Sequence, residues 1–347
     1  MPLVHALQIA SFKQFSDISK RYNATSIGQS AGGLPINHVT LSDNGKSKPR
    51  VGIICNVAGN SLSTVNFCLS LVDDALVQKN LNLLLSNYNI HVIPSLNIDG
   101  LRNAYNDLEN GDKNANGVDL SHAFPYLRNN SNMDQTQNEP EVNSVIDFLK
   151  KEAFQVVVII GASRTGLTFP LYHTLEKHEG IIDDSIHRET SKKAWDANPG
   201  LATSGCSVGV GQGSKIISPD KKAPVGTLED YVYLKYGSLT FHLDVSCSVE
   251  SGSDEYTGNK EVLEELIRAA DRGLHGQVVV PDGTGVVGAT VSVVGPHGTK
   301  HTVYSGDGGF FWAPLAPQTY DLEISYGEGI HLFTIFTIVF SLVINIM

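Results

Sequence analysis

Residues 156–160 read Val-Val-Val-Ile-Ile, and this unbroken run of β-branched apolar residues decides the fold class. Successive side chains of a strand point to opposite faces of its sheet, so a strand of this composition needs cover on both faces. Short apolar runs of the same kind occur at residues 51–55, 91–94 and 239–243. Segments with helical apolar spacing separate or follow them, at residues 65–76, 139–150 and 260–271. This alternation predicts an α/β fold with a mixed sheet and helices on both of its faces.

The composition changes at Gly273, which divides the chain into two predicted domains. Short strand-like runs follow at residues 276–280, 289–294 and 320–324, and glycine-rich turns separate them at residues 281–283 and 306–309. Turn signals at this spacing are typical of a small antiparallel β-sandwich. We therefore expect an α/β domain over residues 1–272 and a β-domain over residues 273–329.

The last segment, residues 330–347, is almost entirely apolar and carries no formal charge. Its 18 residues come close to the minimum of about 17 that a membrane-spanning helix needs. A membrane anchor is the favoured interpretation. The alternative is an altered chain end that replaces a native last strand. A glycolipid-anchor signal fits less well, because the polar spacer of such signals is missing.

Net charge and cysteine spacing argue against several classes of partner and of metal or redox site. The formal net charge is −11 and no basic patch is visible, which argues against a nucleic-acid partner. The four cysteines form no Cys-x-x-Cys pair, so they predict neither a zinc module nor a thioredoxin-type motif, and their pairing stays open.

Two sequons favour the secretory pathway, with an extracellular or membrane-anchored protein as the expectation. They are Asn23-Ala24-Thr25 and Asn129-Asn130-Ser131. The first twelve residues lack the basic and apolar regions of a signal peptide. We therefore expect a chain that is incomplete or that begins inside a longer precursor.

Five short motifs follow one another in a characteristic order. They are Ser-Ile-Gly-Gln-Ser at 26–30, Ile-Pro-Ser-Leu-Asn-Ile-Asp-Gly at 93–100, Asn-Ala-Asn-Gly-Val-Asp-Leu at 114–120, Gly-Thr-Leu-Glu-Asp-Tyr-Val-Tyr at 226–233 and Gly-Leu-His-Gly at 273–276. Their order and spacing resemble the zinc metallocarboxypeptidases, specifically the regulatory group that includes carboxypeptidases D, E, N and M. The resemblance implies a catalytic α/β domain followed by a transthyretin-like β-domain.

The same resemblance implies where zinc ligands should lie. Two histidines and a glutamate hold the metal in that family, and a bound water completes its coordination. The first two ligands belong in the loop after residues 51–55, where Ala58 and Ser61 stand instead. The third belongs eight residues before Phe169-Pro170, at Gly161. The sequence therefore predicts that no metal is bound and that no cofactor is needed.

The implied substrate site is also altered. Ser121 and His122 stand where the family has Asn-Arg, and Asp112 replaces an upstream arginine. An acid in place of a guanidinium would repel the substrate carboxylate that the arginine grips. Asn97 is kept, and it is a further candidate for substrate binding.

Two more positions complete the implied site. Tyr233 matches the family's substrate-covering tyrosine, although an ordinary packed aromatic is an equally good interpretation of it. Asp244 occupies the position of the general base, one methylene or about 1.5 Å shorter than glutamate.

These changes predict a catalytically inactive domain that binds peptides or proteins, peptide C-termini among them. In this respect the chain resembles the inactive third domain of carboxypeptidase D. The alternative is an active carboxypeptidase that releases basic C-terminal residues through a rearranged metal site, and a damaged gene product is the third interpretation.

Overall fold

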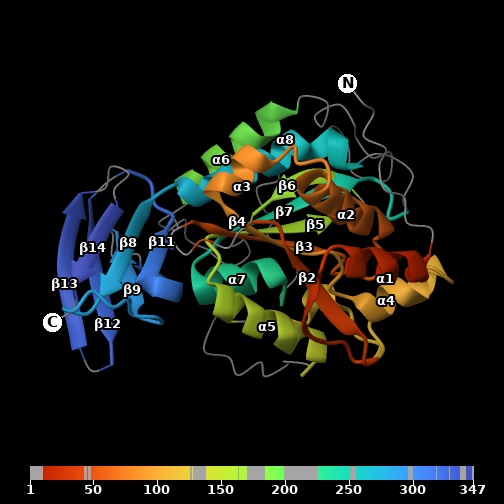
Figure 1. Cartoon of the computed structure of the whole chain (residues 1–347), viewed down its shortest axis with the longest axis horizontal. Coiled ribbons are helices and arrows are strands. Elements are labelled where there is room, and N and C mark those ends of the chain that lie inside the picture. Colours follow the sequence, from red (N-terminus) through yellow and green to blue (C-terminus); the bar gives the residue numbers. More distant parts are fainter. Residues whose placement is uncertain are drawn as a thin grey trace, which may run out of the picture.

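The computed structural model shows an α/β domain beside a β-sandwich (Figure 1). It describes residues 11–42, 45, 48–125, 127, 138–162, 164–169, 184–198, 226–250, 255–295, 300–317, 319–327, 329–336 and 341–345. The boundary between the two parts falls after the 3₁₀ turn Ala269–Asp271, where the next strand begins at Leu274.

The sheet of the α/β domain has seven strands in the order β1-β2-β4-β3-β5-β7-β6. The inner strands β4, β3, β5 and β7 pair in parallel, and the outer strands β1, β2 and β6 pair antiparallel to their neighbours. The sheet is therefore mixed, as predicted. Its strands are β1 (Thr25–Gln29), β2 (Pro35–Thr40), β3 (Arg50–Cys55), β4 (Asn89–Ile93), β5 (Val156–Gly161), β6 (Arg164–Thr168) and β7 (Leu239–Ser246).

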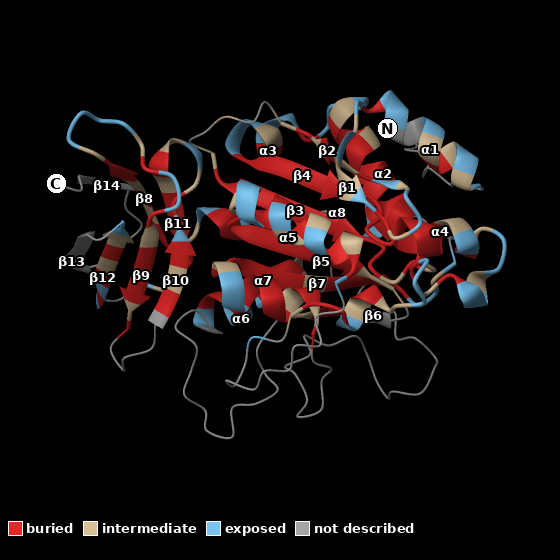
Figure 2. Ribbon diagram, turned by 90° about the horizontal axis from the view of Figure 1, so that it is seen from below, coloured by how far each residue is buried: buried red, intermediate tan, exposed pale blue. Residues whose placement is uncertain are grey.

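Strand β5 shows why the opening apolar run needs cover on both faces. Val156, Val158 and Ile160 belong to one buried apolar cluster, and Val157 and Ile159 belong to another. The alternation of side chains along the strand divides the run between the two faces. Figure 2 shows these central strands buried between helices whose outer sides are exposed.

Helices cover both faces of the sheet (Figure 1). On one face lie α2 (Leu62–Leu76), α3 (Asn82–Asn87), α6 (Asp184–Ala197) and α8 (Glu255–Arg268). On the other lie α1 (Phe12–Arg21), α4 (Ile98–Ala104), α5 (Pro140–Glu152) and α7 (Leu228–Tyr236). Two 3₁₀ turns, Leu108–Asn110 and Leu120–His122, connect α4 to the chain that leads to α5. The predicted layer arrangement is confirmed.

The second domain is a sandwich of two small sheets, with strand orders β10-β9-β12-β13 and β11-β8-β14. All of its pairs are antiparallel except β14 with β8. Buried side chains such as Val278, Val291, Phe311 and Leu322 fill the space between the sheets. The strands are β8 (Leu274–Val279), β9 (Thr290–Val294), β10 (Lys300–Tyr304), β11 (Phe310–Ala313), β12 (Thr319–Tyr326), β13 (Gly329–Phe336) and β14 (Ser341–Asn345).

The apolar C-terminal segment differs from the favoured expectation of a spanning helix. Its described residues form β13, which pairs along β12 from Gly329 to Phe336, and β14, which pairs with β8. The segment is rich in isoleucine, valine, threonine and phenylalanine, and such residues favour strands when they can pair. A search of the described residues for a helix of sufficient length and hydropathy to span a bilayer finds none. The alternative interpretation, an altered chain end that replaces a native last strand, stays a prediction.

One cysteine pairing that the spacing did not predict is present. Cys55 ends β3 and Cys68 lies on α2, and the two form a disulfide with their Cα atoms 6.4 Å apart. Both residues are fully buried. Cys247 is also disulfide-bonded, and Cys206 lies outside the described residues. The Cys55–Cys68 bond links the two ends of the segment that carries the first two lost ligand positions.

Candidate functional site

The 56–61 loop leads from the carboxyl end of β3 into α2. Asn56 is fully buried in a left-handed conformation with φ of 55°. Its backbone N–H donates to Thr64 Oγ1 at 3.1 Å, and its side-chain Nδ2 donates to Ser95 Oγ at 2.8 Å. These bonds tie a strained residue to α2 and to the chain after β4. The loop is therefore well fixed, although it carries none of the expected metal ligands.

Ala58 and Ser61 lie at the turn into α2. The N–H of Ser61 donates to the carbonyl of Ala58 at 3.0 Å. Ser61 is buried at the N-cap position of α2, but its hydroxyl makes no capping bond. Between them, Gly59 is packed so closely that an added Cβ would lie 2.4 Å from the Gly111 carbonyl and 2.5 Å from the Cα of Gly100. The loop thus rests directly on α4 and on the chain that carries Asp112.

Gly161, the third lost ligand position, ends β5 beside Asp244 of β7. A Cβ added to Gly161 would lie 2.1 Å from Nε2 of His242 and 2.4 Å from Oδ1 of Asp244. Both distances are far shorter than any contact that a real Cβ makes. The space that a side chain at position 161 would need is therefore filled by the imidazole and the carboxylate.

His242 lies between two carboxylates, and we call Glu229, His242 and Asp244 the His242 triad. Nδ1 of His242 bonds to Oε1 of Glu229, and Nε2 lies 3.3 Å from Oδ1 of Asp244. An imidazole that faces a carboxylate oxygen at each nitrogen must donate from both, so it is protonated. Side-chain exposure is 25% for His242, 18% for Glu229 and 4% for Asp244.

The charges of the triad shift its pKa values in the expected directions. Burial would lower the pKa of His242, but the neighbouring charges of Asp244 and Glu229 raise it to about 10. Burial would raise the pKa of Glu229, and the charge and hydrogen bond of His242 hold it below its usual range instead. The positive charge of His242 thus offsets one of the two carboxylate charges that face its ring.

Helix α7 places Glu229 beside His242. Thr227 caps the helix, and its hydroxyl accepts a hydrogen bond from the Asp230 N–H at 3.3 Å. Glu229 therefore lies in the first turn, where the helix dipole favours a negative charge. Gly226 precedes the cap with φ of +77°, and a Cβ there would lie 2.7 Å from the His122 carbonyl. The start of α7 is thereby fixed against the turn that carries Ser121 and His122.

The residues present do not fit a zinc ion. Ala58 offers a methyl group and Gly161 no side chain, so neither has a donor atom. Ser61 offers a single buried hydroxyl, which is not among the ligands that zinc uses in proteins. Among the residues with described coordinates, no cluster of three or more histidine, cysteine, aspartate and glutamate residues is arranged to hold a metal ion. We derive no hydrolytic step through a metal in this chain.

The predicted substrate residues occupy different environments. Asn97 is fully buried and uses its amide inside the fold, because Oδ1 accepts from Gly100 N at 2.9 Å and Nδ2 donates to the Asp112 carbonyl at 3.1 Å. Ser121 is half-buried and His122 is exposed in the turn Leu120–His122. Of these three residues, His122 offers the most surface to a ligand.

Tyr233 is largely buried on α7, with 6% of its surface exposed. Its ring packs against His187 and His301, with centroid distances of 5.5 and 6.0 Å. A contact between Tyr233 and a ligand stays a prediction, and it requires the ring to leave this packing.

The chain matches the family described as zinc carboxypeptidase over residues 10–265 and the carboxypeptidase regulatory-like domain over residues 273–331. The chain belongs to the zinc carboxypeptidase family. The family resemblance and the fold class predicted from the motifs are confirmed.

Relatives of this zinc carboxypeptidase homologue include carboxypeptidases N and D, both at low sequence identity. The carboxypeptidase N catalytic chain of Mus musculus is 25% identical over 359 residues, which cover 89% of this chain and 76% of the relative. Carboxypeptidase D of Homo sapiens is 26% identical over 271 residues, which cover 70% of this chain and 19% of the relative. The chain therefore corresponds to about a fifth of carboxypeptidase D.

Solved structures support the fold alone. Carboxypeptidase A from Helicoverpa armigera has a TM-score of 0.58 at 15% identity, covering 75% of this chain and 73% of that one. Bovine thrombin-activatable fibrinolysis inhibitor, in complex with tick carboxypeptidase inhibitor, has a TM-score of 0.55 at 18% identity, covering 75% and 94%.

The family motifs that this carboxypeptidase homologue keeps meet in a buried polar network. Asn114 donates from Nδ2 to Glu139 at 2.6 Å and to Glu141 at 3.2 Å. Asp99 accepts from the hydroxyl of Ser30 at 3.0 Å and from the N–H of Gly32 at 2.7 Å. These bonds join the 26–30 motif to the 93–100 motif and the 114–120 motif to the start of α5, and the Ala31 N–H, which donates to Oε1 of Glu141 at 3.0 Å, links the two groups. The retention of these motifs is explained by folding and needs no catalysis.

The sequence interpretation missed Glu229 and His242. A signal was available for His242, because residues 242 and 244 of one strand must point to the same face. That face is the one on which the family places its general base, so a histidine there is chemically conspicuous. No local pattern connects Glu229 to His242, since they lie on different elements and meet only in the folded chain.

Proposed function

We propose that this zinc carboxypeptidase homologue is a catalytically inactive domain that binds peptides or proteins. The observation that carries the proposal is the contact at Gly161, where His242 and Asp244 fill the space of the missing third ligand. The absence of donor atoms at Ala58 and Gly161 supports it further. The well-ordered bonds of the 56–61 loop support a fold that is still maintained without these ligands.

A peptide ligand is expected at the carboxyl edge of the sheet, beside the turn Leu120–His122. Binding sites of parallel sheets lie at this edge. His122 is exposed there and can donate a hydrogen bond to a peptide carboxylate or carbonyl. Asp112 introduces a negative charge in the neighbouring segment of the same chain, and this charge weakens the preference of the site for a C-terminal carboxylate. We therefore expect modest affinity and little dependence on a free C-terminus.

The test combines metal analysis, hydrolysis and binding on the purified full chain. We expect far less than one zinc per chain after dialysis against zinc, and no release of Lys or Arg from peptides that end in these residues. Binding of the same peptides, with free and amidated C-termini, is measured by calorimetry. Stoichiometric zinc together with hydrolysis would overturn the proposal in favour of an active carboxypeptidase with a rearranged site.

His122 provides the matched pair of variants for the binding measurement. His122→Ala removes one donor and should weaken peptide binding by about 3- to 10-fold, the size of one hydrogen bond. Asn106→Ala changes another exposed residue after α4 and should leave binding unchanged. Equal affinities for both variants would place the binding surface elsewhere.

We also propose that the protein matures in the secretory pathway. Its Cys55–Cys68 disulfide is typical of an oxidising compartment. Asn23 is exposed in a left-handed turn between α1 and β1, with φ of 51°, which suits an acceptor of N-linked glycan. The test is expression in a secreting eukaryotic host, followed by glycosidase treatment of the wild type and of Asn23→Gln. Glycosidase should shift the electrophoretic band of the wild type, and an unshifted wild-type band would contradict the proposal.

Asn129, in the second sequon, lies outside the described residues. Strands β13 and β14 include most of the segment 330–347 for which a membrane anchor was expected.

A further inference from the structure

We propose that His242 is an internal substitute for the metal ion of the family, held by Glu229 and Asp244 in the space that the third ligand has left. This inference rests on the proposed absence of zinc binding, and it goes further by assigning the place of the metal to a side chain of the protein. On this view, the loss of the ligand side chain at position 161 and the presence of His242 depend on each other.

The register of β5 and β7 places Gly161 next to His242 and Asp244. Ile159 pairs with His242, and Gly161 pairs with Asp244. The imidazole of His242 therefore extends along the sheet edge toward Gly161, and its Nε2 reaches the point where a Cβ would begin. A glycine at 161 is the one residue that leaves this space open. A ligand side chain at 161 and the observed position of His242 exclude each other.

Charge explains why a cation is required there. Glu229 and Asp244 both direct carboxylate oxygens at the same ring, and two carboxylates so close together repel each other in a partly buried site. A protonated imidazole between them removes the repulsion and satisfies an oxygen of each. In an active family member a divalent ion supplies the positive charge at this edge of the sheet. In this chain the protein supplies it.

The first consequence concerns attempts to restore the metal site. The three changes Ala58→His, Ser61→Glu and Gly161→His return the ligand set that the family resemblance implies. Because His242 occupies the space of the third ligand, these changes alone should leave zinc binding weak. Adding His242→Ser removes the imidazole from this space and the competing charge with it, and only the Asp244 carboxylate stays beside position 161. We expect the four-change variant to bind zinc at least tenfold more tightly than the three-change variant.

The control keeps the number of histidines equal. His275→Ser, on β8 of the sandwich, removes a histidine whose ring packs against Trp312 of β11, away from α7 and the triad. In the three-change background it should not raise zinc affinity. Zinc content after dialysis and the visible absorption of bound cobalt are the readouts. Equal and tight zinc binding with and without His242→Ser, in protein whose wild type holds no metal, would overturn this inference and leave the proposed function intact.

A second measurement does not depend on building a metal site. Gly161→Ala places a methyl group at the 2.1 Å contact and should lower the melting temperature by about 5 °C. His242→Ser relieves that contact and leaves the 2.4 Å contact with Oδ1 of Asp244, so the alanine should cost less in the double variant Gly161→Ala/His242→Ser. Strong non-additivity of this kind supports the inference. Additive effects of the two substitutions, with both single variants folded, would contradict it.

Discussion

The ring of His301 on β10 packs against the ring of Tyr233 on α7, with their centroids 6.0 Å apart. Glu229 in the first turn of α7 bonds to His242, and Gly237, the C-cap residue at the other end, would place an added Cβ 2.5 Å from the carbonyl of Thr302. One nine-residue helix therefore connects the triad to the β-sandwich. The second domain helps to hold the candidate site in place.

Truncating His301 should therefore loosen α7. His301→Ala removes a ring that is 95% buried at the domain boundary, and we expect a loss of about 1–3 kcal/mol in the free energy of unfolding. Hydrogen exchange of the α7 amides should accelerate before that of β5. Tyr304→Ala, on the same strand but 39% exposed, is the control and should change stability by less than about 1 kcal/mol. Equal exchange rates of α7 in the two variants would contradict this.

The fold could be predicted from the sequence because its determinants are local. The run at 156–160 is buried on both faces because it has no polar side chain to turn toward water, and this holds wherever the strand lies in the sheet. The C-terminal segment was predicted less well. Its apolar length satisfies a membrane helix, and only pairing with β12 and β8 decides for strands. Strand β12 is the adjacent strand of β13, but β8 lies far back along the chain from β14, and pairing over such a separation leaves no mark on local hydropathy.

Some residues of the candidate site could likewise be predicted from the sequence, and others could not. Ala58, Ser61 and Gly161 could be located by counting from motifs, and the structure places Gly161 beside Asp244 as the sheet register requires. The role of Asn97 could not be predicted, because its amide bonds run to Gly100 and to the backbone of Asp112 rather than outward. The triad was missed because its chemistry arises from the meeting of α7 with β7.

Removing Asn114 tests whether the retained motif is structural. Asn114→Ala leaves Glu139 and Glu141 without the amide that donates to both, although both carboxylates stay buried. Burial already raises the pKa of Glu141, against hydrogen bonds that lower it, so losing one of those bonds should raise it further. We expect a loss of about 2–4 kcal/mol in the free energy of unfolding by urea. Asn110→Ala, an exposed neighbour bonded only to Asp107 among the contacts described, should cost less than about 1 kcal/mol. Similar losses for both variants would sink this interpretation.

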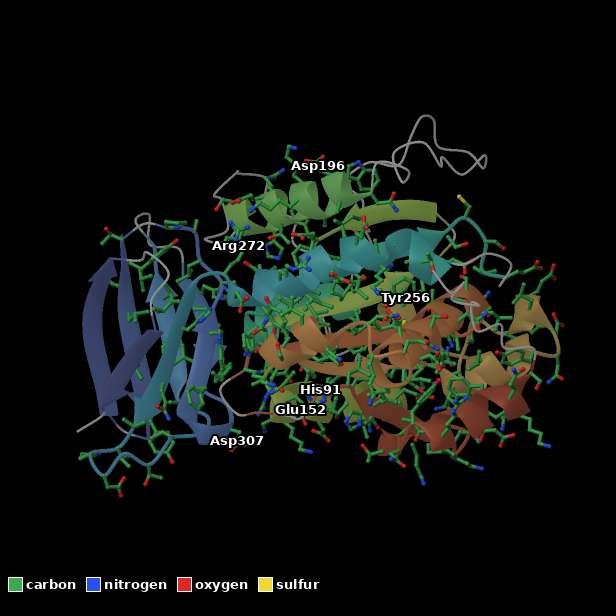
Figure 3. The ribbon with its side chains drawn as sticks, turned by 45° about the horizontal axis from the view of Figure 1, so that its top comes forward. His91, Glu152, Asp196, Tyr256, Arg272 and Asp307 are labelled. Carbon is green, nitrogen blue, oxygen red and sulfur yellow. A yellow bond between two sulfur atoms is a disulfide. The ribbon has the colours of Figure 1, made fainter. Side chains whose placement is uncertain are left out.

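His91 should contribute to acid sensitivity. It is 2% exposed, its Nε2 lies 3.8 Å from Glu152, and both residues are labelled in Figure 3. Burial, followed by the charges of His38 and Arg50, lowers the pKa of His91 to about 3. A histidine with a folded pKa below its unfolded value stabilises the fold fully above about pH 6.5 and loses that contribution as the pH falls toward 3.

The variant His91→Gln removes this titration. Its free energy of unfolding should fall less steeply than that of the wild type between pH 6.5 and pH 4, whatever its stability at neutral pH. His122→Gln changes an exposed histidine and should keep the wild-type slope. Urea unfolding at several pH values measures both slopes. A His91→Gln slope equal to the wild type would show that His91 is not buried in its neutral form.

His242 should make the stability of the fold decrease as the pH rises, the opposite of the effect of His91. Its pKa in the folded chain is raised to about 10, so its contribution is complete below about pH 6.5 and is lost as the pH rises from there to 10. Wild-type protein should therefore lose stability over this interval. His242→Gln keeps a donor for Glu229 or Asp244 but carries no charge, so it should be less stable than the wild type at pH 6 and should approach it at pH 10. Glu229→Gln removes one of the two carboxylates that raise the pKa of His242, and it should move the alkaline loss to lower pH. Parallel stability curves for the wild type and His242→Gln between pH 6.5 and pH 10 would mean that the ring between Glu229 and Asp244 does not carry the positive charge that its two contacts require.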